Sequence, residues 1–258
     1  MSDHSKFLYK YRAIDESNID RVQRIFTDNK LYFSSRDQFN DPFDCKLDYS
    51  FAASDKQIKK YLSPGLARKY PKYNRKQKQH WIGEALQKIK RQDPTVMKEI
   101  KQGSEKIISE LGIFSLTRVP DDILMWSHYA DSHKGFCIKL LDDEKERFIA
   151  RAQPISYSDD YPIVNPIKDD GLLRLEKTLL TKARHWEYEK EWRIIDHDDG
   201  PGIKRFPPHL LVGVIFGCRM SETHKSLIRE WCINRQVGAS FYQAREASRT
   251  YSLEIVEV

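Results

Sequence analysis

The chain has 258 residues, of which 40% are hydrophobic and 12% are aromatic. This is enough apolar material for one substantial core, and it excludes a disulfide-stapled miniprotein and a disordered tail. The four cysteines, Cys45, Cys137, Cys218 and Cys232, lie far apart without a C-x-x-C pair, which favours reduced thiols over a zinc site. The sequence contains neither a secretory leader nor an apolar run of membrane-spanning length. We therefore expect a cytoplasmic protein that needs no metal and does not contact the membrane.

The formal net charge of +6 is distributed unevenly along the chain. Residues 56–106 contain 15 Lys or Arg against 4 Asp or Glu, a local balance of +11, which leaves the remaining residues near −5. A positive surface of this size attracts phosphates or an acidic partner, with salt-sensitive binding. A solvated helical surface accounts for the same counts, so charge alone leaves both interpretations open.

Short elements are expected in the first fifty residues. Aromatic and charged residues alternate over 7–12, a pattern that predicts a strand on the edge of a half-solvated sheet. Ser17 is a candidate N-cap for a short helix that Asn29 can end. A strand at 31–35 then runs into Asn-Asp-Pro at 40–42, which forces a turn because the residue before proline avoids the helical region.

Helical periodicity replaces the strand pattern between residues 55 and 111. Apolar residues recur there at helical spacing, and breaks are expected at 63–65, Pro71 and Pro94. The sequence thus predicts one α+β domain, residues 1–258, with a basic helical insertion at about 55–111.

Strands and helices are mixed after the insertion. The expected strands are 113–116, 135–140, 191–196, 210–216, 239–244 and 251–256. The expected helices are 121–130, 172–183 and 222–234. The glycine that opens the second of these strands suggests a close approach of two backbones. Many short strands with few crossover helices favour a mixed, mostly antiparallel sheet of α+β type over a doubly wound sheet.

The densest group of candidate catalytic residues is the segment WEYEKEWR at 186–193. No phosphate-binding glycine loop, H-E-x-x-H or G-x-S-x-G motif is present, so common kinase and hydrolase assignments lose their support. In a strand, Glu189, Glu191 and Arg193 would face one way, while Tyr188 and Trp192 would face the other. Two carboxylates on one surface can divide the work of charge stabilisation and nucleophile activation. The alternative is a surface strand with ordinary cross-strand ion pairs.

A second group lies on the predicted helix at 121–130 and just after it. Trp126, Tyr129 and His133 fall near one helical face and could stack on a heteroaromatic ligand, while Ser127 and His128 offer hydrogen bonds. An amphipathic helix with its aromatic residues in the core and histidines near its C-terminus explains the same spacing.

The N-terminal strands carry the remaining candidates. Lys10 and Arg12 could clasp a pyrophosphate, and Tyr32, Ser34 and Asn40 lie on or after the second strand. Lys10 and Arg12 could equally be solvent-facing charges on the strand.

The segments LYKYRAI, LYFSSRDQFNDPFD, FSLTRVPDDILMWSHYADSHKGFCIKL and WEYEKEWRII resemble, in this order, the bacterial family named domain of unknown function 2971. The resemblance extends from Leu8 to about Phe216 and implies no activity.

The order of these elements is also similar to the mono-ADP-ribosyltransferase fold, whose signature is Arg or His, then Ser or Tyr, then Glu. That resemblance implies a split sheet of this type, NAD as substrate and no metal. Glu191 would stabilise the charge that develops on the ribose, with Glu189 two residues before it. The residues that would hold NAD are Lys10, Arg12, Tyr32, Ser34, Asn40, Trp126, His128 and Tyr129.

The resemblance implies an NAD-dependent mono-ADP-ribosyltransferase, a toxin or antiviral defence effector that modifies nucleic acid or a protein. RNA or DNA would bind through residues 56–106, and an antitoxin protein is a further expected partner. The alternative is a non-catalytic nucleic-acid-binding defence protein that uses the basic helices. A nuclease or phosphodiesterase is the third option, but the sequence lacks a two-metal set of carboxylates and histidines.

Overall fold

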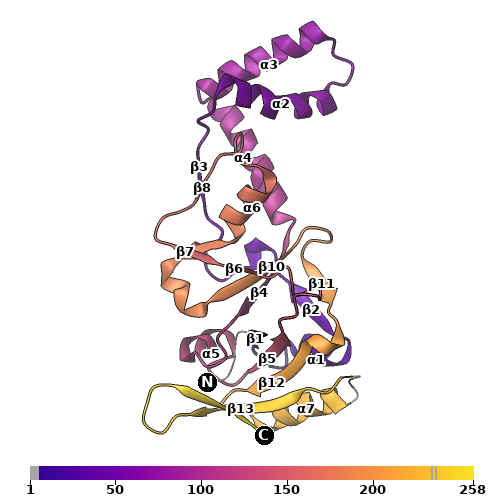
Figure 1. Ribbon diagram of the computed structural model, residues 1–258, viewed down its shortest axis with the longest axis vertical. Helices are drawn as coiled ribbons and strands as arrows, with labels where there is room; N and C mark the ends of the chain where they lie inside the picture. Colours follow the sequence, from indigo (N-terminus) through magenta and orange to yellow (C-terminus); the bar gives the residue numbers. More distant parts are fainter. Residues whose placement is uncertain (1–5, 234, 236) are drawn as a thin grey trace. The chain divides into compact units, whose positions relative to one another are not determined.

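The computed structural model describes residues 6–233, 235 and 237–258, and the chain divides into two compact units (Figure 1). Unit 1 comprises Met1–Gln38, Leu111–Ile155 and Arg184–Val258, and unit 2 comprises Phe39–Glu110 and Ser156–Ala183. The expected insertion at 55–111 therefore falls almost wholly in unit 2, which also takes up residues 156–183.

A large sheet forms the centre of unit 1, and its strand order is β14-β13-β12-β5-β1-β4-β10-β6. The strands are β1 (Phe7–Arg12), β4 (Gly112–Thr117), β5 (Phe136–Leu141), β6 (Gln153–Pro154), β10 (Glu191–Asp196), β12 (Leu211–Phe216), β13 (Ser240–Glu246) and β14 (Leu253–Glu257). Every neighbouring pair is antiparallel except β12 and β13. The expected α+β class with a mostly antiparallel sheet is confirmed.

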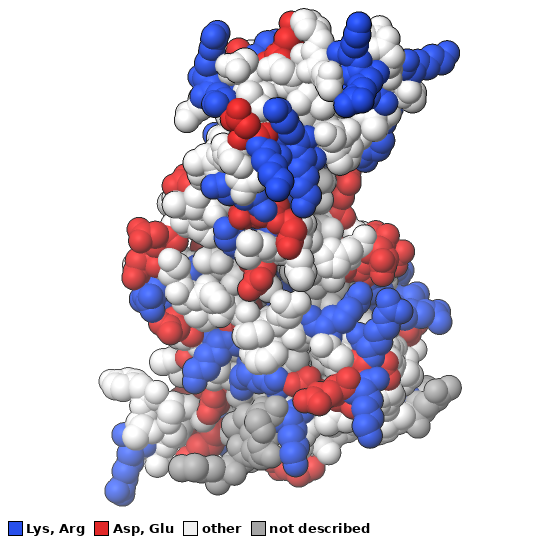
Figure 2. Space-filling model, turned by 45° about the horizontal axis from the view of Figure 1, so that its top comes forward, with Lys and Arg blue, Asp and Glu red and all other residues white. Residues whose placement is uncertain are grey.

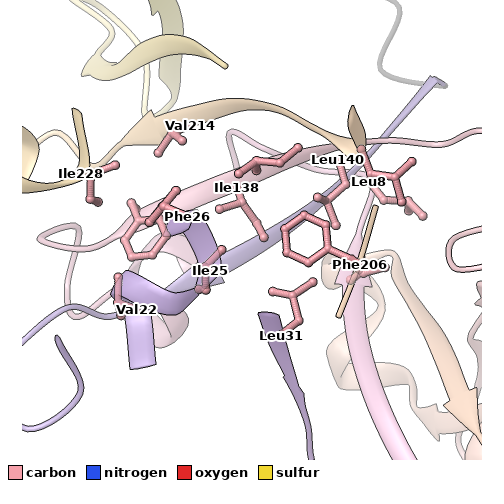
Figure 3. Close-up of a cluster of buried hydrophobic side chains, with 14 of the residues drawn as sticks. Leu8, Val22, Ile25, Phe26, Leu31, Ile138, Leu140, Phe206, Val214 and Ile228 are labelled. Carbon is pink, nitrogen blue, oxygen red and sulfur yellow. The ribbon is translucent and has the colours of Figure 1, made fainter. Parts of the chain in front are cut away.

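One face of this sheet carries the main hydrophobic core of unit 1. Helices α1 (Ile19–Thr27) and α7 (Glu222–Ile233) pack on it, as does β2 (Lys30–Phe33), which pairs with β11 (Gly202–Arg205). Figure 3 shows Phe26 of α1 and Ile228 of α7 against Ile138 of the sheet. The alternation of the strand residues produces this face, because Leu8 and Ile138 point to it while their sequence neighbours point away.

Helix α5 (Ile123–Tyr129) covers the opposite face of the sheet. Asp122 caps it by accepting hydrogen bonds from the backbone N–H groups of Leu124 and Met125. Trp126 is fully buried, and its ring meets Tyr11 of β1 edge to face at 5.0 Å between centroids. This second, smaller core holds α5 against β1.

Unit 2 is mainly helical. Its helices are α2 (Asp55–Lys69), α3 (Arg75–Lys90), α4 (Pro94–Ser109) and α6 (Gly171–Leu179). Two short parallel pairs accompany them: β3 (Asp48–Tyr49) with β8 (Ile163–Val164), and β7 (Ser156–Ser158) with β9 (Thr181–Ala183). Ile58, Leu86 and Met97 form its buried core with Ile89 and Ile167.

Four local predictions are wrong. Strand β1 lies between β5 and β4 inside the sheet and not at its edge, because its partners come from distant parts of the chain. Helix α2 runs through Pro64 without the expected break, since the missing N–H costs one hydrogen bond in a helix with a complete capping box at Ser54. The N-cap of α1 is Asn18, because Ser17 donates to Asp15 instead. The helix expected at 172–183 ends at Leu179, and its last residues form β9.

The glycine prediction is confirmed. A Cβ atom on Gly135 would lie 2.1 Å from the carbonyl oxygen of Arg12, so only glycine allows this approach of β5 to β1. Helix α7 begins at Glu222 as expected, and its expected end, Asn234, lies outside the described residues.

Candidate active site

Glu189 and Glu191 are both buried at the start of β10, with 3% and 5% of their surfaces exposed. Glu189 ends the 3₁₀ helix η3 (Arg184–Glu189), and β10 begins at Glu191. Between them, Lys190 adopts a left-handed backbone with φ of 42°. For a residue with a side chain this conformation costs about 1 kcal/mol, and such strain clusters at functional sites.

Glu191 is fixed by an ion pair with Arg193 on the same strand. Its Oε1 accepts from Nε of Arg193 at 2.7 Å, and its Oε2 accepts from Nη2 at 3.1 Å. Only 1% of Arg193 is exposed. The predicted common orientation of Glu191 and Arg193 is confirmed, and the bidentate contact sets the carboxylate plane.

Glu189 is held from two sides. Its Oε1 accepts a hydrogen bond of 2.6 Å from the hydroxyl of Tyr129 on α5. Its backbone carbonyl accepts from the hydroxyl of Thr117 on β4. Burial, followed by the Glu189 carboxylate, raises the pKa of Tyr129 well above its ordinary value, and Glu191 raises it further. Both carboxylates therefore lie on the same face of the sheet as Tyr129, and both disfavour ionisation of its hydroxyl.

Aromatic side chains lie beside this carboxylate pair. The ring of His128 contacts Tyr129 at 6.2 Å and Trp186 at 6.3 Å between centroids, and Trp186 lies 6.1 Å from Tyr188. His128 is exposed, while Tyr129, Trp186 and Tyr188 are half-buried. Their rings offer flat apolar surface next to two acidic groups, an arrangement suited to a heteroaromatic ligand.

Lys10 and Arg12 point away from this cluster, which corrects their predicted role beside Glu191. Thr117 of β4 is directly opposite both Tyr9 of β1 and Glu191 of β10. Directly opposite residues share a face, so Tyr9 and Glu191 lie on the face that α5 covers. Lys10 and Arg12 alternate with Tyr9 and belong to the other face, where Nζ of Lys10 lies 5.3 Å from the ring centroid of Phe114.

Ser34 and Tyr32 also lie apart from Glu191. The backbone of Ser34 pairs with Ile113, four residues along β4 from Thr117, which is roughly 13 Å at the rise of a strand. The hydroxyl of Tyr32 bonds to Gln38 at 3.1 Å, and Arg21 covers its ring.

The last two predicted residues are Trp126, in the core of unit 1, and Asn40, in unit 2. Trp126 has no exposed surface, and its indole N–H donates to the carbonyl oxygen of Pro120 at 2.9 Å, so it supports Tyr129 from the core and presents no ring face to a ligand. Asn40 is an exposed residue of unit 2.

Three residues of the cluster were not predicted as site residues: Tyr188, Trp186 and Arg193. The expected strand alternation placed Tyr188 with Trp192, away from the glutamates. The strand begins only at Glu191, so the 3₁₀ turn instead brings Tyr188 to the α5 face, where it packs with Tyr129. The signal for all three was the composition of the segment 186–193, which combines aromatic rings with alternating charges.

Comparison with known families gives one match, to the family described as protein of unknown function (DUF2971), over residues 125–194. The match confirms the predicted family, although the N-terminal motifs lie outside it. It contains every residue of the cluster, from His128 and Tyr129 to Arg193. Comparison with curated proteins and with solved structures found no match. No helix in the described part of the chain is long and apolar enough to span a membrane.

Proposed function

We propose that this cluster cleaves the nicotinamide–ribose bond of NAD and transfers ADP-ribose. Residues 125–194 match the DUF2971 family, whose description assigns no activity, so the proposal is argued from the cluster itself. The observation that carries the proposal is the pair of buried glutamates held by Tyr129 and Arg193. Burying two carboxylates costs folding free energy, which a purely structural role could avoid with apolar residues.

The two glutamates are suited to different roles. The carboxylate of Glu191, oriented by Arg193, is a group that can accept a hydrogen bond from a ribose hydroxyl. Its charge then stabilises the positive charge that develops on the ribose carbon as the bond to nicotinamide breaks. Glu189, which shares a short hydrogen bond with Tyr129, can accept the proton of an incoming hydroxyl or amine.

NAD fits this cluster in part. The rings of Tyr129, Trp186 and Tyr188 match the flat nicotinamide, and the glutamates match the ribose hydroxyls. Lys10 and Arg12 do not contribute, since their side chains leave the opposite face of the sheet. The ADP-ribosyltransferase fold, an antitoxin partner and a role in defence stay predictions from the sequence.

Release of free nicotinamide from NAD by the purified protein tests the proposal directly. The matched control is the Glu191→Gln variant, which keeps the size of the side chain and an acceptor for Arg193. Nicotinamide release that depends on Glu191 would support the proposal. Release by neither protein, with RNA, DNA and protein extracts offered as acceptors, would contradict it.

A further inference from the structure

The turn between α2 and α3 in unit 2 concentrates positive charge. Residues Arg68–Lys76, called here the α2–α3 corner, contain five cations and no acidic residue: Arg68, Lys69, Lys72, Arg75 and Lys76. All five side chains are exposed, and Figure 2 shows Lys and Arg side chains projecting from the part of unit 2 that α2 and α3 form. By contrast, Lys90 of α3 forms an ion pair with Asp55 of α2, with 2.9 Å between Nζ and Oδ1. Within the described residues, no carboxylate makes an ion pair with the corner cations.

Aromatic rings stack among these cations. Tyr70 and Tyr73 lie 4.6 Å apart between centroids with 15° between their planes, and Trp81 packs on Tyr70 at 6.4 Å. Nζ of Lys69 lies 5.6 Å from the ring centroid of Tyr70. Both tyrosines are half-buried, so the stack is held in place and still has surface to offer.

The position of two cations at the corner opposes the stability of α3. Arg75 and Lys76 open the helix, and its first turn contains no acidic residue. A helix N-terminus carries partial positive charge, so cations there are unfavourable by about 0.3–1 kcal/mol each, and acidic residues are the usual choice. Arg68 and Lys69 end α2, where cations are favourable, and they bring further positive charge to the same corner. Bound phosphates would relieve this repulsion.

We propose that the α2–α3 corner binds single-stranded RNA or DNA, with phosphates on the five cations and bases stacked on Tyr70 and Tyr73. The pairing of cations with a preformed aromatic stack carries this proposal. Exposed bases of a single strand can stack on aromatic side chains, whereas bases in a duplex already stack on one another. An acidic protein would pair with the cations and would not require the stacked rings.

The proposal is independent of catalysis and is tested by binding alone, without NAD. The full chain is titrated into a fluorescently labelled single-stranded U12, dT12 or a matched duplex, and anisotropy is followed at several salt concentrations. With five phosphate contacts, log K should fall with log salt at a slope of about −3.5 for a single strand. We expect Tyr73→Leu to weaken U12 binding about tenfold, and Tyr73→Phe, which keeps the ring, to leave it near the parent value.

A charge-matched pair of variants separates the corner from the general positive charge of unit 2. One variant changes the five corner cations to Gln, and its control changes Lys56, Lys59, Lys60, Lys98 and Lys106 to Gln; all five control residues are exposed. The corner variant should reduce the slope of log K against log salt by up to about 3.5, while the control variant should keep most of that slope. Equal loss in both variants, preferred binding of the duplex or of polyglutamate, or unchanged binding by a folded Tyr73→Leu protein would each overturn the proposal. Nicotinamide release by the corner variant, measured separately, reports on the site of unit 1.

Discussion

The hydroxyl of Tyr129 donates a hydrogen bond of 2.6 Å to Oε1 of Glu189, and this contact joins helix α5 to the turn that precedes β10. The two residues are sixty positions apart in the chain, and both lie inside the segment that matches the family. The bond positions one of the two buried carboxylates, so disturbing it should change both stability and activity.

Tyr129→Phe removes only this hydroxyl. Glu189 then loses one donor in a buried position, which should lower the free energy of unfolding by about 1–3 kcal/mol. We expect NAD turnover to fall about tenfold, because one hydrogen bond is worth roughly that factor in rate. Urea denaturation and nicotinamide release are the measurements, with Tyr251→Phe as a control on a fully exposed tyrosine. A change of equal size in the control would contradict the assignment.

The same hydroxyl predicts an alkaline pH dependence. Burial, then the Glu189 carboxylate, raises the pKa of Tyr129 above its ordinary value of 10 in the folded chain. Above pH 10 the unfolded chain releases this proton while the folded chain retains it, so stability is present below pH 10 and is lost as the pH rises. Buried Tyr9 and Tyr11 behave in the same way.

The contribution of Tyr129 can be isolated by comparing the parent with Tyr129→Phe between pH 9 and pH 11.5. The loss of unfolding free energy should be less steep in the variant by about 1.4 kcal/mol per pH unit, the slope for one proton. Parallel curves for the two proteins would show that the phenol of Tyr129 titrates alike in the folded and unfolded chains.

Glu191→Gln should lower the rate of NAD turnover by at least about two orders of magnitude and leave the fold intact. One carboxylate aimed at a developing charge is often worth roughly 10²–10³ in rate. Glu187→Gln is the control, since Glu187 lies two residues before Glu189 with 59% of its side chain exposed. If a folded Glu191→Gln protein turned over NAD at the rate of the parent, Glu191 would not be the residue that stabilises the developing charge. Either Glu189 would have that role or this cluster would not be catalytic.

The buried pair of Glu191 and Arg193 should be strongly coupled in stability. Arg193→Met leaves the Glu191 carboxylate buried without its bidentate donor, which should cost about 3–5 kcal/mol. In the double variant Arg193→Met/Glu191→Gln, the free energy of unfolding should fall by less than the sum of the decreases in the two single variants, because neither buried charge of the pair then remains. Urea denaturation of the four proteins measures this coupling, and additive losses would show that the two side chains act independently.

The strands of unit 1 could be predicted from the sequence because alternation of aromatic or apolar and polar residues is local. The predicted bounds of β1 and β10 are those observed, Phe7–Arg12 and Glu191–Asp196. The partners of these strands depend on contacts between distant segments. The order β5-β1-β4-β10 places Lys10 and Glu191 on opposite faces, a relation that no spacing within either segment contains.

The candidate site was predicted in part for the same reason. Glu189 and Glu191 stood out in a short motif, but the expected period of two did not apply to Glu189, which belongs to a 3₁₀ turn with Lys190 in a left-handed conformation. The link from Tyr129 to Glu189 requires α5 to pack beside β10. From the sequence, Tyr129 and Glu189 could be identified only as two separate candidate residues and not as a hydrogen-bonded pair.

The position of Arg12 provides the sharpest test of how NAD would bind. Its Nε is buried without a hydrogen-bond partner, and burial together with Arg21 lowers its pKa from 12.5 to about 10. The unfolded chain holds this proton more tightly, so the charge opposes folding below pH 10, and the cost decreases as the pH rises from about 10 towards the ordinary value of 12.5. At neutral pH that difference corresponds to about 3 kcal/mol, so Arg12→Met should raise the free energy of unfolding by up to that amount, less the packing that the longer arginine side chain provides.

Because Arg12 and Glu191 lie on opposite faces of the sheet, Arg12→Met should also leave NAD turnover within about twofold of the parent. Arg245→Met, at an exposed position of β13, is the control for the change of charge. A large rise in KM for NAD in Arg12→Met alone would mean that the arginine binds the phosphates after all. In that case the carboxylate pair on the α5 face would not be where the nicotinamide–ribose bond is cleaved.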